Sequence, residues 1–250
     1  MNFDINNDLL IIPDVHGRTF WRYAVENMKY SHVVFLGDYI DPYPQEGIRP
    51  VEAFKMLIEI VNFAKDNPDT CTLLLGNHDM HYMSADYASK ATGSRFSYAL
   101  EEAANCLFCE NEELFSLAFE ADFGPWHCLL THAGITKQWY LQHRDIIGDL
   151  TAENLNKLTQ SKEGIDTLTD IGMIRGGFSP TGSMVWADYD EVVRNGRLPG
   201  IYQIFGHTQS VDRRVRITRH VACVDCQKPL MLSEVLAVAA KVRRNFTRSS

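Results

Sequence analysis

The sequence predicts an α/β fold that gathers polar residues at one edge of a parallel β-sheet. Five short apolar runs each end at a small cluster of Asp, Asn or His residues, with glycine close by. Apolar runs of this length, bounded by glycine, predict buried strands. Helical patterns separate the early runs, and a strand–helix–strand order implies parallel strands with right-handed crossovers. Polar residues just past the carboxyl ends of such strands lie where open α/β sheets place their sites.

The five clusters share one composition, since all of them contain side chains that bind metal ions. In chain order, the runs and their clusters are residues 9–12 before Asp14 and His16, residues 32–36 before Asp38 and Asp41, residues 72–75 before Asn77 and His78, residues 128–130 before His132, and residues 201–205 before His207. A single cluster of this kind would carry little information. Five of them, each at the end of a predicted strand, are hard to explain by packing alone.

The expected helices follow the strands in order. Residues 50–65 carry the strongest pattern, because apolar side chains recur there at i, i+3 and i+4. Residues 18–29 and residues 151–160 are also expected to be helical, the second with Thr151 as its N-cap. Between residues 80 and 122, a largely helical insertion is expected in place of a simple crossover.

The C-terminal part of the chain changes character. From residue 215 onward, β-branched residues predict further strands, whereas residues 230–242 fit either a strand or a helix. Residues 241–250 are basic, and we expect them to form a frayed tail. Residues 1–240 are accordingly predicted to form a single domain.

The composition is typical of a globular protein, and it makes some classes of binding partner unlikely. At 250 residues the chain is long enough for a substantial core. Its formal net charge of −8 argues against a general nucleic-acid footprint, so nucleic acid is an unlikely partner. The sequence contains neither an apolar run as long as a membrane span nor a signal-peptide core, and we expect a cytoplasmic protein without a membrane partner. An anionic substrate would need local positive charge from metals or from individual arginines.

Six cysteines include two pairs with the C-x-x-C spacing, namely Cys106 with Cys109 and Cys223 with Cys226. Together the pairs could form a four-thiolate zinc site. Simple burial explains them better, because the first pair lies in an expected amphipathic helix within residues 96–119. The second pair lies in a β-like stretch, where odd spacing places the two side chains on opposite faces.

The ligand types at the strand ends predict two divalent metals. Asp14 and His16 are two residues apart, so both point the same way on an extended chain. Asp38 can offer one oxygen to each of two metals. The six expected ligands are Asp14, His16, Asp38, Asn77, His132 and His207. All are oxygen or nitrogen donors, which suits Mn, Fe or Zn. Two metals about 3.5–4 Å apart can clamp a phosphate, and a hydroxide held between them can attack phosphorus.

His78 is expected to act as a general acid. It follows Asn77 directly, so on a tight turn it faces elsewhere and can protonate a leaving alkoxide. Asp41, three residues past Asp38, could hold His78 in its protonated form. The remaining histidines are interpreted as ordinary core or surface residues, as most lone histidines are; they are His32, His81, His127, His143 and His220.

These motifs together resemble the calcineurin-like metallophosphoesterases. The matching series is Asp14-x-His16-Gly17, Gly37-Asp38-x-x-Asp41, Gly76-Asn77-His78-Asp79, His132 and Gly206-His207-Thr208, within residues 8–230. The chain is most similar to the phosphoprotein-phosphatase type and its bacterial diadenosine tetraphosphatase branch. Asp79 stands where protein phosphatases usually carry Glu and the tetraphosphatases carry Asp.

The resemblance implies a fold and roles for individual residues, and the sequence departs from the family pattern at one phosphate-binding position. The implied fold is two mixed β-sheets packed as a sandwich flanked by helices. Arg175 matches an arginine that, together with Asn77, grips substrate phosphate in the family. Members also carry an arginine directly after the residue that matches Asp41, but here Pro42 stands there. Arg49 and Arg95 are candidates to replace it.

We therefore expect a metal-dependent phosphoesterase that hydrolyses phosphoric monoesters, in the manner of serine/threonine phosphatases. Its substrate would be a phosphoprotein, a nucleotide or a phosphorylated small molecule. The same site could instead hydrolyse the anhydride bond of dinucleoside tetraphosphates. A phosphodiesterase or nuclease would require a basic groove, which the sequence lacks. A phosphate-binding module without activity is disfavoured, because unused buried charges are costly.

Overall fold

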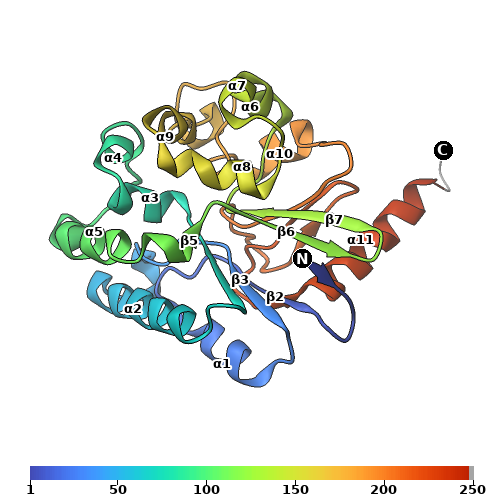
Figure 1. The fold of residues 1–250 in the computed structure, drawn as a ribbon, viewed down its shortest axis with the longest axis horizontal. Coiled ribbons are helices and arrows are strands. Elements are labelled where there is room, and N and C mark those ends of the chain that lie inside the picture. Colours follow the sequence, from blue (N-terminus) through green and yellow to red (C-terminus); the bar gives the residue numbers. More distant parts are fainter. Residues whose placement is uncertain (248–250) are drawn as a thin grey trace.

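Two mixed β-sheets pack face to face with helices outside them in the computed structural model, which describes residues 1–247 (Figure 1). This arrangement confirms the expected sandwich. The five-stranded sheet has the order β11 (Leu230–Met231), β2 (Leu9–Ile12), β3 (His32–Phe35), β4 (Cys71–Leu74) and β5 (Phe115–Ser116). The six-stranded sheet has the order β1 (Asn2–Phe3), β6 (Ala118–Phe123), β7 (Trp126–Thr131), β8 (Tyr202–Phe205), β10 (Val221–Cys223) and β9 (Arg216–Ile217).

Strand β2 is apolar throughout because both of its faces are buried. In β2, Leu9 and Ile11 belong to the core between the two sheets, whereas Leu10 and Ile12 belong to the core under the helices. This alternation is the period of two that an extended strand imposes. Strands β2, β3 and β4 run parallel to one another, and so do β7, β8 and β10. Their carboxyl ends define the edge where the polar clusters lie.

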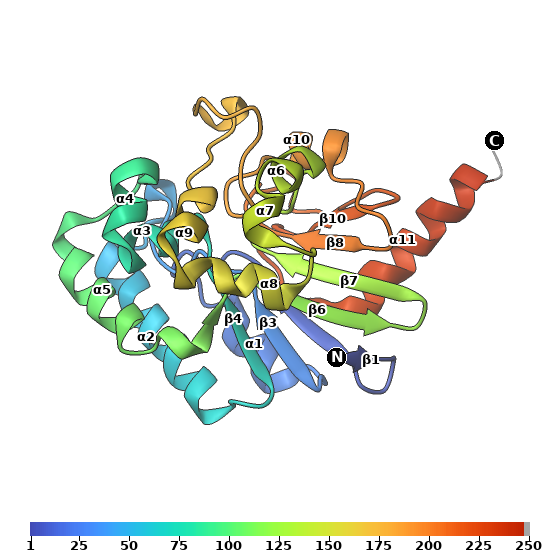
Figure 2. The ribbon, with the colours of Figure 1, turned by 45° about the horizontal axis from the view of Figure 1, so that its top comes forward.

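Helices cover the outer faces in groups (Figure 2). The α-helices between β2 and β6 are α1 (Phe20–Asn27), α2 (Pro50–Asp66), α3 (Asn77–Met83), α4 (Ala85–Ala91) and α5 (Glu101–Cys109). Those between β7 and β8 are α6 (Lys137–Gln142), α7 (Arg144–Ile147), α8 (Ala152–Asn156), α9 (Lys162–Leu168) and α10 (Tyr189–Asn195). Short 3-10 turns are η1 (Pro44–Glu46), η2 (Tyr98–Leu100), η3 (Glu112–Leu114), η4 (Lys157–Gln160) and η5 (Met173–Arg175). The helix expected over residues 151–160 is thus α8 followed by η4, and Thr151 caps it by accepting from the Asn154 N–H.

The helical insertion is shorter than the sequence pattern indicated. Our expectation of helix within residues 96–119 is wrong for its last part, because residues 115–116 and 118–123 form β5 and β6. β6 pairs antiparallel with β7 along six residue pairs, beginning at Ala118 opposite Thr131. This hairpin pairing satisfies the backbone groups that a longer helix would otherwise have satisfied.

The C-terminal segment is helical. After the two residues of β11, α11 (Leu232–Thr247) packs Leu232, Val235 and Leu236 against the core between the sheets. Residues 241–247, for which the sequence predicts a frayed tail, continue this helix, and Nε of Arg243 donates to the carbonyl of Arg219. Residues 248–250 lie outside the described part of the chain.

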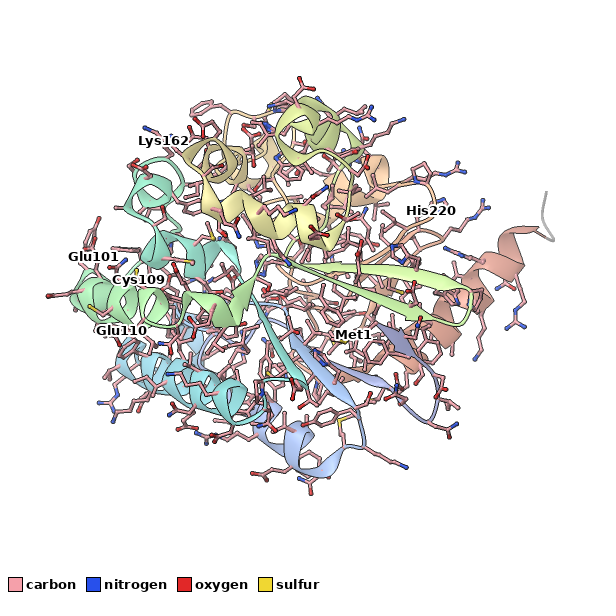
Figure 3. All side chains as sticks on the ribbon, viewed as in Figure 1. Met1, Glu101, Cys109, Glu110, Lys162 and His220 are labelled. Atoms are coloured by element: carbon pink, nitrogen blue, oxygen red, sulfur yellow. The ribbon has the colours of Figure 1, made fainter. Side chains whose placement is uncertain are left out.

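The cysteines do not assemble in the described part of the chain. Cys106 and Cys109 are exposed on α5, and the label of Cys109 marks the outer rim of the molecule in Figure 3. Cys223 and Cys226 are buried in or just beyond β10. Among residues 1–247, no group of candidate metal ligands includes a cysteine. Every helix within the same residues is too short or too polar to cross a lipid bilayer.

Candidate metal centre

The six expected ligands come together at the edge where strands of both sheets end. Asp14 and His16 follow β2, Asp38 follows β3, and Asn77 opens α3 directly after β4. The second sheet contributes His132 after β7 and His207 after β8. All six side chains are buried, with no more than 8% of any residue exposed. Contributions from two sheets explain why the ligands span nearly two hundred residues of sequence.

Unusual backbone turns orient these side chains. Among the described residues, six that are not glycine have a positive φ, and four of them belong to the site: His16 at 46°, Asp38 at 52°, Asp41 at 57° and His207 at 61°. Such left-handed conformations cost about 1–3 kcal/mol each and persist where the surroundings impose them. Each one lies past the end of a strand. Three of them direct an expected ligand into the centre, whereas Asp41 directs its carboxylate to His78 beside it.

Two glycines leave room for the carboxylates. A Cβ atom on Gly76 would lie 2.1 Å from Oδ1 of Asp38, and one on Gly206 would lie 2.1 Å from Oδ1 of Asp14. Real Cβ contacts are never this short, so any other residue at these positions would displace a ligand. These glycines therefore belong to the site as much as the acids do.

Asp79 ties together the turns that carry Asp38 and Asn77. Its carboxylate accepts the backbone N–H groups of Asp38 at 2.6 Å, of Tyr39 at 3.0 Å and of Gly76 at 2.8 Å. The N–H of His78 in turn donates to Oδ1 of Asp38 at 3.0 Å. Asp79 thus positions the ligands without itself pointing into the centre.

Asp38 lies between two groups of ligands. One oxygen, Oδ2, is 3.4 Å from Nε2 of His16 and 3.5 Å from Nε2 of His132. The ring of His16 donates its Nδ1–H to the carbonyl of Ile40 at 2.8 Å, which leaves Nε2 with a lone pair directed at the centre. The first group is therefore Asp14, His16 and Asp38.

The second group contains Asp38, His132 and His207, with Asn77 beside them. The ring of His132 donates its Nδ1–H to the Leu36 carbonyl at 2.8 Å, and its Nε2 lies 3.2 Å from Oδ1 of Asn77. The same Nε2 lies 3.1 Å from Nδ1 of His207, whose own Nε2 is buried without a hydrogen-bond partner among the described residues. Acceptor atoms thus converge here, and a bound cation would satisfy them.

Electrostatics favours the same conclusion. Burial lowers the pKa of His16 to about 3 and lowers the pKa of His207 well below its ordinary value, so both imidazoles are neutral near pH 7. Burial also acts to raise the pKa of Asp38, but the surrounding histidines, led by His132, lower it overall. Burial raises the pKa of Asp14, and the nearby Asp38 adds to this effect. A neutral-imidazole and carboxylate donor set without thiolates fits two divalent transition metals.

A hydrogen-bonded network fixes His78 beside this centre. Asp41 accepts Nδ1–H of His78 at 2.8 Å, Nε2–H of His81 at 2.7 Å and the hydroxyl of Tyr82 at 2.7 Å. The backbone N–H of Gly93 donates to Nδ1 of His81 at 3.0 Å, so the proton of His81 is on Nε2. Although burial raises the pKa of Asp41, the hydrogen bonds from the two histidines lower it overall.

His81 and Tyr82 are neighbours of Asp41 that the sequence analysis did not connect with the site. We interpreted His81 as an ordinary core or surface residue, but its buried ring contacts Asp41 directly. The available signal was helical spacing, since positions 78, 81 and 82 share one face of α3. Because α3 begins directly after β4, residues one helical turn past His78 also reach the carboxylate of Asp41.

A cavity of about 510 Å³ opens onto these residues, and Asp38, Asn77, His78, Arg95, Arg175 and His207 are among those that line it. Arg175 is held there by two contacts. Its Nε is 3.0 Å from Oδ2 of Asp188, and its Nη2 donates to Oγ1 of Thr208 at 2.6 Å. Arg49 does not line the cavity; it pairs with Glu52 at the exposed start of α2.

Fold and site together define a metallohydrolase built on an α/β sandwich. The family model of calcineurin-like phosphoesterases matches residues 8–210. The chain belongs to this family, as its motifs indicated, and it is a metal-dependent phosphoesterase that acts on phosphorylated substrates. A search of curated protein sequences gave no match.

Comparison with solved structures gave matches at low sequence identity. A cold-active protein-tyrosine phosphatase from a psychrophilic Shewanella species is 15% identical, with a TM-score of 0.55, over 92% of this chain and 76% of that chain. A protein serine/threonine phosphatase from Saccharomyces cerevisiae is 14% identical, with a TM-score of 0.47, over 90% of this chain and 70% of that chain.

Proposed function

We propose that the protein hydrolyses phosphoric monoesters with two divalent metals, manganese being the first to test. The observation that carries this proposal is the position of Asp38 Oδ2, within 3.5 Å of histidine nitrogens in both ligand groups. Asp14, His16 and Asp38 would hold one metal, and Asp38, Asn77, His132 and His207 the other. When bound, two such cations neutralise phosphate charge and activate water for in-line attack.

The protein's own side chains would do the rest. Arg175 and Asn77 line the cavity and would bind the phosphoryl oxygens, which develop charge in the transition state. His78 would give a proton to the leaving oxygen from Nε2, once this nitrogen has been protonated and released from Nη2 of Arg95, which donates to it at 3.0 Å here; its Nδ1–H stays hydrogen-bonded to Asp41. Asp41, supported by His81 and Tyr82, would stabilise the cationic ring.

A dinucleoside tetraphosphate remains the second candidate substrate. The resemblance to the tetraphosphatase branch supports it through Asp79, which stands where protein phosphatases carry Glu and which accepts three backbone N–H groups here. An anhydride has a better leaving group than an alkyl monoester, so its hydrolysis would depend less on His78.

A substrate panel with manganese-loaded protein tests the proposal. The panel contains p-nitrophenyl phosphate, phosphopeptides, a dinucleoside tetraphosphate and bis-p-nitrophenyl phosphate. We expect turnover of the monoesters to exceed turnover of the diester, because the net charge of −8 offers no basic groove. A clear preference for the tetraphosphate would favour the second candidate, and a preference for the diester would contradict both.

Arg175→Ala is expected to raise KM for monoesters about tenfold or more and to weaken inhibition by inorganic phosphate, because charge-assisted hydrogen bonds to the phosphate are lost. Metal content should not change. Arg175→Lys should not restore binding, since lysine lacks the bidentate guanidinium fork. Steady-state kinetics with phosphate inhibition measure both effects.

The matched control is Arg22→Ala, which removes an arginine that pairs with Glu59 away from this cavity. It should leave KM and phosphate inhibition as in the wild type. Unchanged kinetics in Arg175→Ala would show that Arg175 does not bind the substrate phosphate.

A further inference from the structure

We propose that Arg95, stacked on Tyr43, is a second phosphate-binding residue of the cavity and favours terminal phosphate groups over diesters. This inference rests on the proposed function and adds a specificity element to the same site. Both residues line the cavity with Asp38, Asn77 and Arg175. Arg95 comes from the loop between α4 and η2, so the helical insertion supplies it.

The guanidinium of Arg95 stacks on the face of the Tyr43 ring. Its central carbon lies 3.8 Å from the centroid of the Tyr43 ring. Tyr43 is itself fixed, because its ring packs edge-on against His16 with centroids 5.0 Å apart. Stacking of this kind orients the planar group and stabilises its charge. Tyr43 thus serves as a platform between Arg95 and a predicted metal ligand.

Polar contacts fix the other edge of the guanidinium. Nη1 donates to the backbone carbonyl of Asp41, and Nη2 donates to Nε2 of His78 at 3.0 Å. An arginine carries five N–H donors and no acceptor, so these two contacts leave it further donors. A phosphate that contacts Nε2 of His78 in the cavity would therefore also contact the guanidinium of Arg95.

Local sequence explains why an arginine from the insertion is needed. Position 42 is a proline, so the residue directly after Asp41 cannot supply a cation. The next residue, Tyr43, supplies the ring on which Arg95 stacks. Arg95, which is 54 residues away from Asp41 in the sequence, donates a hydrogen bond to the Asp41 carbonyl. Arg175 is the other arginine lining the cavity, and its Nε pairs with Asp188. Arg95 has no carboxylate partner among the described ion pairs.

The expected specificity follows from the oxygens of the substrate. A monoester phosphate has three non-bridging oxygens and up to two negative charges, whereas a diester has two oxygens and one charge. A site that already uses metals and Arg175 leaves a free oxygen for a second guanidinium only in the monoester. Arg95 should therefore strengthen monoester binding more than diester binding.

Binding of inorganic phosphate to the manganese-loaded protein, measured by calorimetry and as an inhibition constant, tests this role. We expect Arg95→Ala to weaken phosphate binding about ten- to a hundredfold, which is typical for a lost charge-assisted contact. Tyr43→Ala should weaken it about three- to tenfold through loss of the platform, and Tyr43→Phe should lose less. KM should rise more for p-nitrophenyl phosphate than for bis-p-nitrophenyl phosphate. Arg49→Ala is the matched control, because Arg49 lies outside the cavity.

A purely structural role would give a different result. If Arg95 only positions His78, then Arg95→Ala will lower kcat and leave phosphate affinity within about twofold of the wild type, which would overturn the proposal. Arg95→Lys covers the case in which the alanine variant fails to fold; it should still bind phosphate at least about threefold more weakly. The two claims fail separately, since a wild type that hydrolyses no ester contradicts only the proposed function.

Discussion

Replacing Asp38 with asparagine is expected to remove most bound metal and nearly all turnover. Among residues 1–247, Asp38 is the one residue that belongs to both groups of candidate ligands, and its Oδ2 lies 3.4 Å from Nε2 of His16 and 3.5 Å from Nε2 of His132. An amide has a single neutral oxygen, so it can serve at most one of the two metals. Mutation of a residue that only hydrogen-bonds to a metal ligand typically lowers metal affinity about 10–100-fold, and the loss of a shared ligand should lower it further.

Elemental analysis after reconstitution, together with kcat, checks this prediction. The wild type should carry two metals per chain, whereas Asp38→Asn should be depleted in both. His207→Ala should empty mainly one position, because His207 belongs to one group of ligands. Asp145→Asn, at an exposed aspartate of α7, is the matched control and should keep both metals. Full metal content and activity in Asp38→Asn would refute the shared-ligand assignment.

His78→Ala is expected to keep both metals and lose about 10²–10⁴-fold in kcat for alkyl phosphates, the usual effect of removing a general acid. His78 lies in the cavity beside Asn77, and Asp41 holds its Nδ1–H at 2.8 Å. The loss should shrink for p-nitrophenyl phosphate, because a good leaving group needs no proton. Kinetics with an alkyl and an aryl phosphate measure the difference.

Equal losses for the two esters would count against the acid role and favour a role in phosphate binding. His127→Ala serves as the control, since His127 is partly exposed and pairs with Asp122 in the six-stranded sheet. Asp41→Asn should reproduce part of the His78 effect, because it weakens the contact that orients the ring. Metal content measured on each variant separates loss of the acid from loss of the centre.

Local patterns in the sequence were enough to predict most of the strands and helices. The strands β2, β3 and β4 were predictable because they are largely apolar, as strands covered on both faces usually are. Helix α2 was predictable because its apolar residues recur with helical spacing and a proline opens it. The segment around β5 and β6 was not, since pairing with β4 and β7 overrides a local preference for helix.

The sequence by itself determined which side chains meet at the centre. Each expected ligand directly follows a strand, and the order of parallel strands brings these ends together. Tertiary structure alone decided how they are oriented and what supports them. The left-handed turns at His16, Asp38 and His207 depend on surroundings that hold a strained backbone. Arg95 reaches Tyr43 and His78 through a loop whose course no local pattern specifies, because contacts between distant segments form only when the whole chain packs.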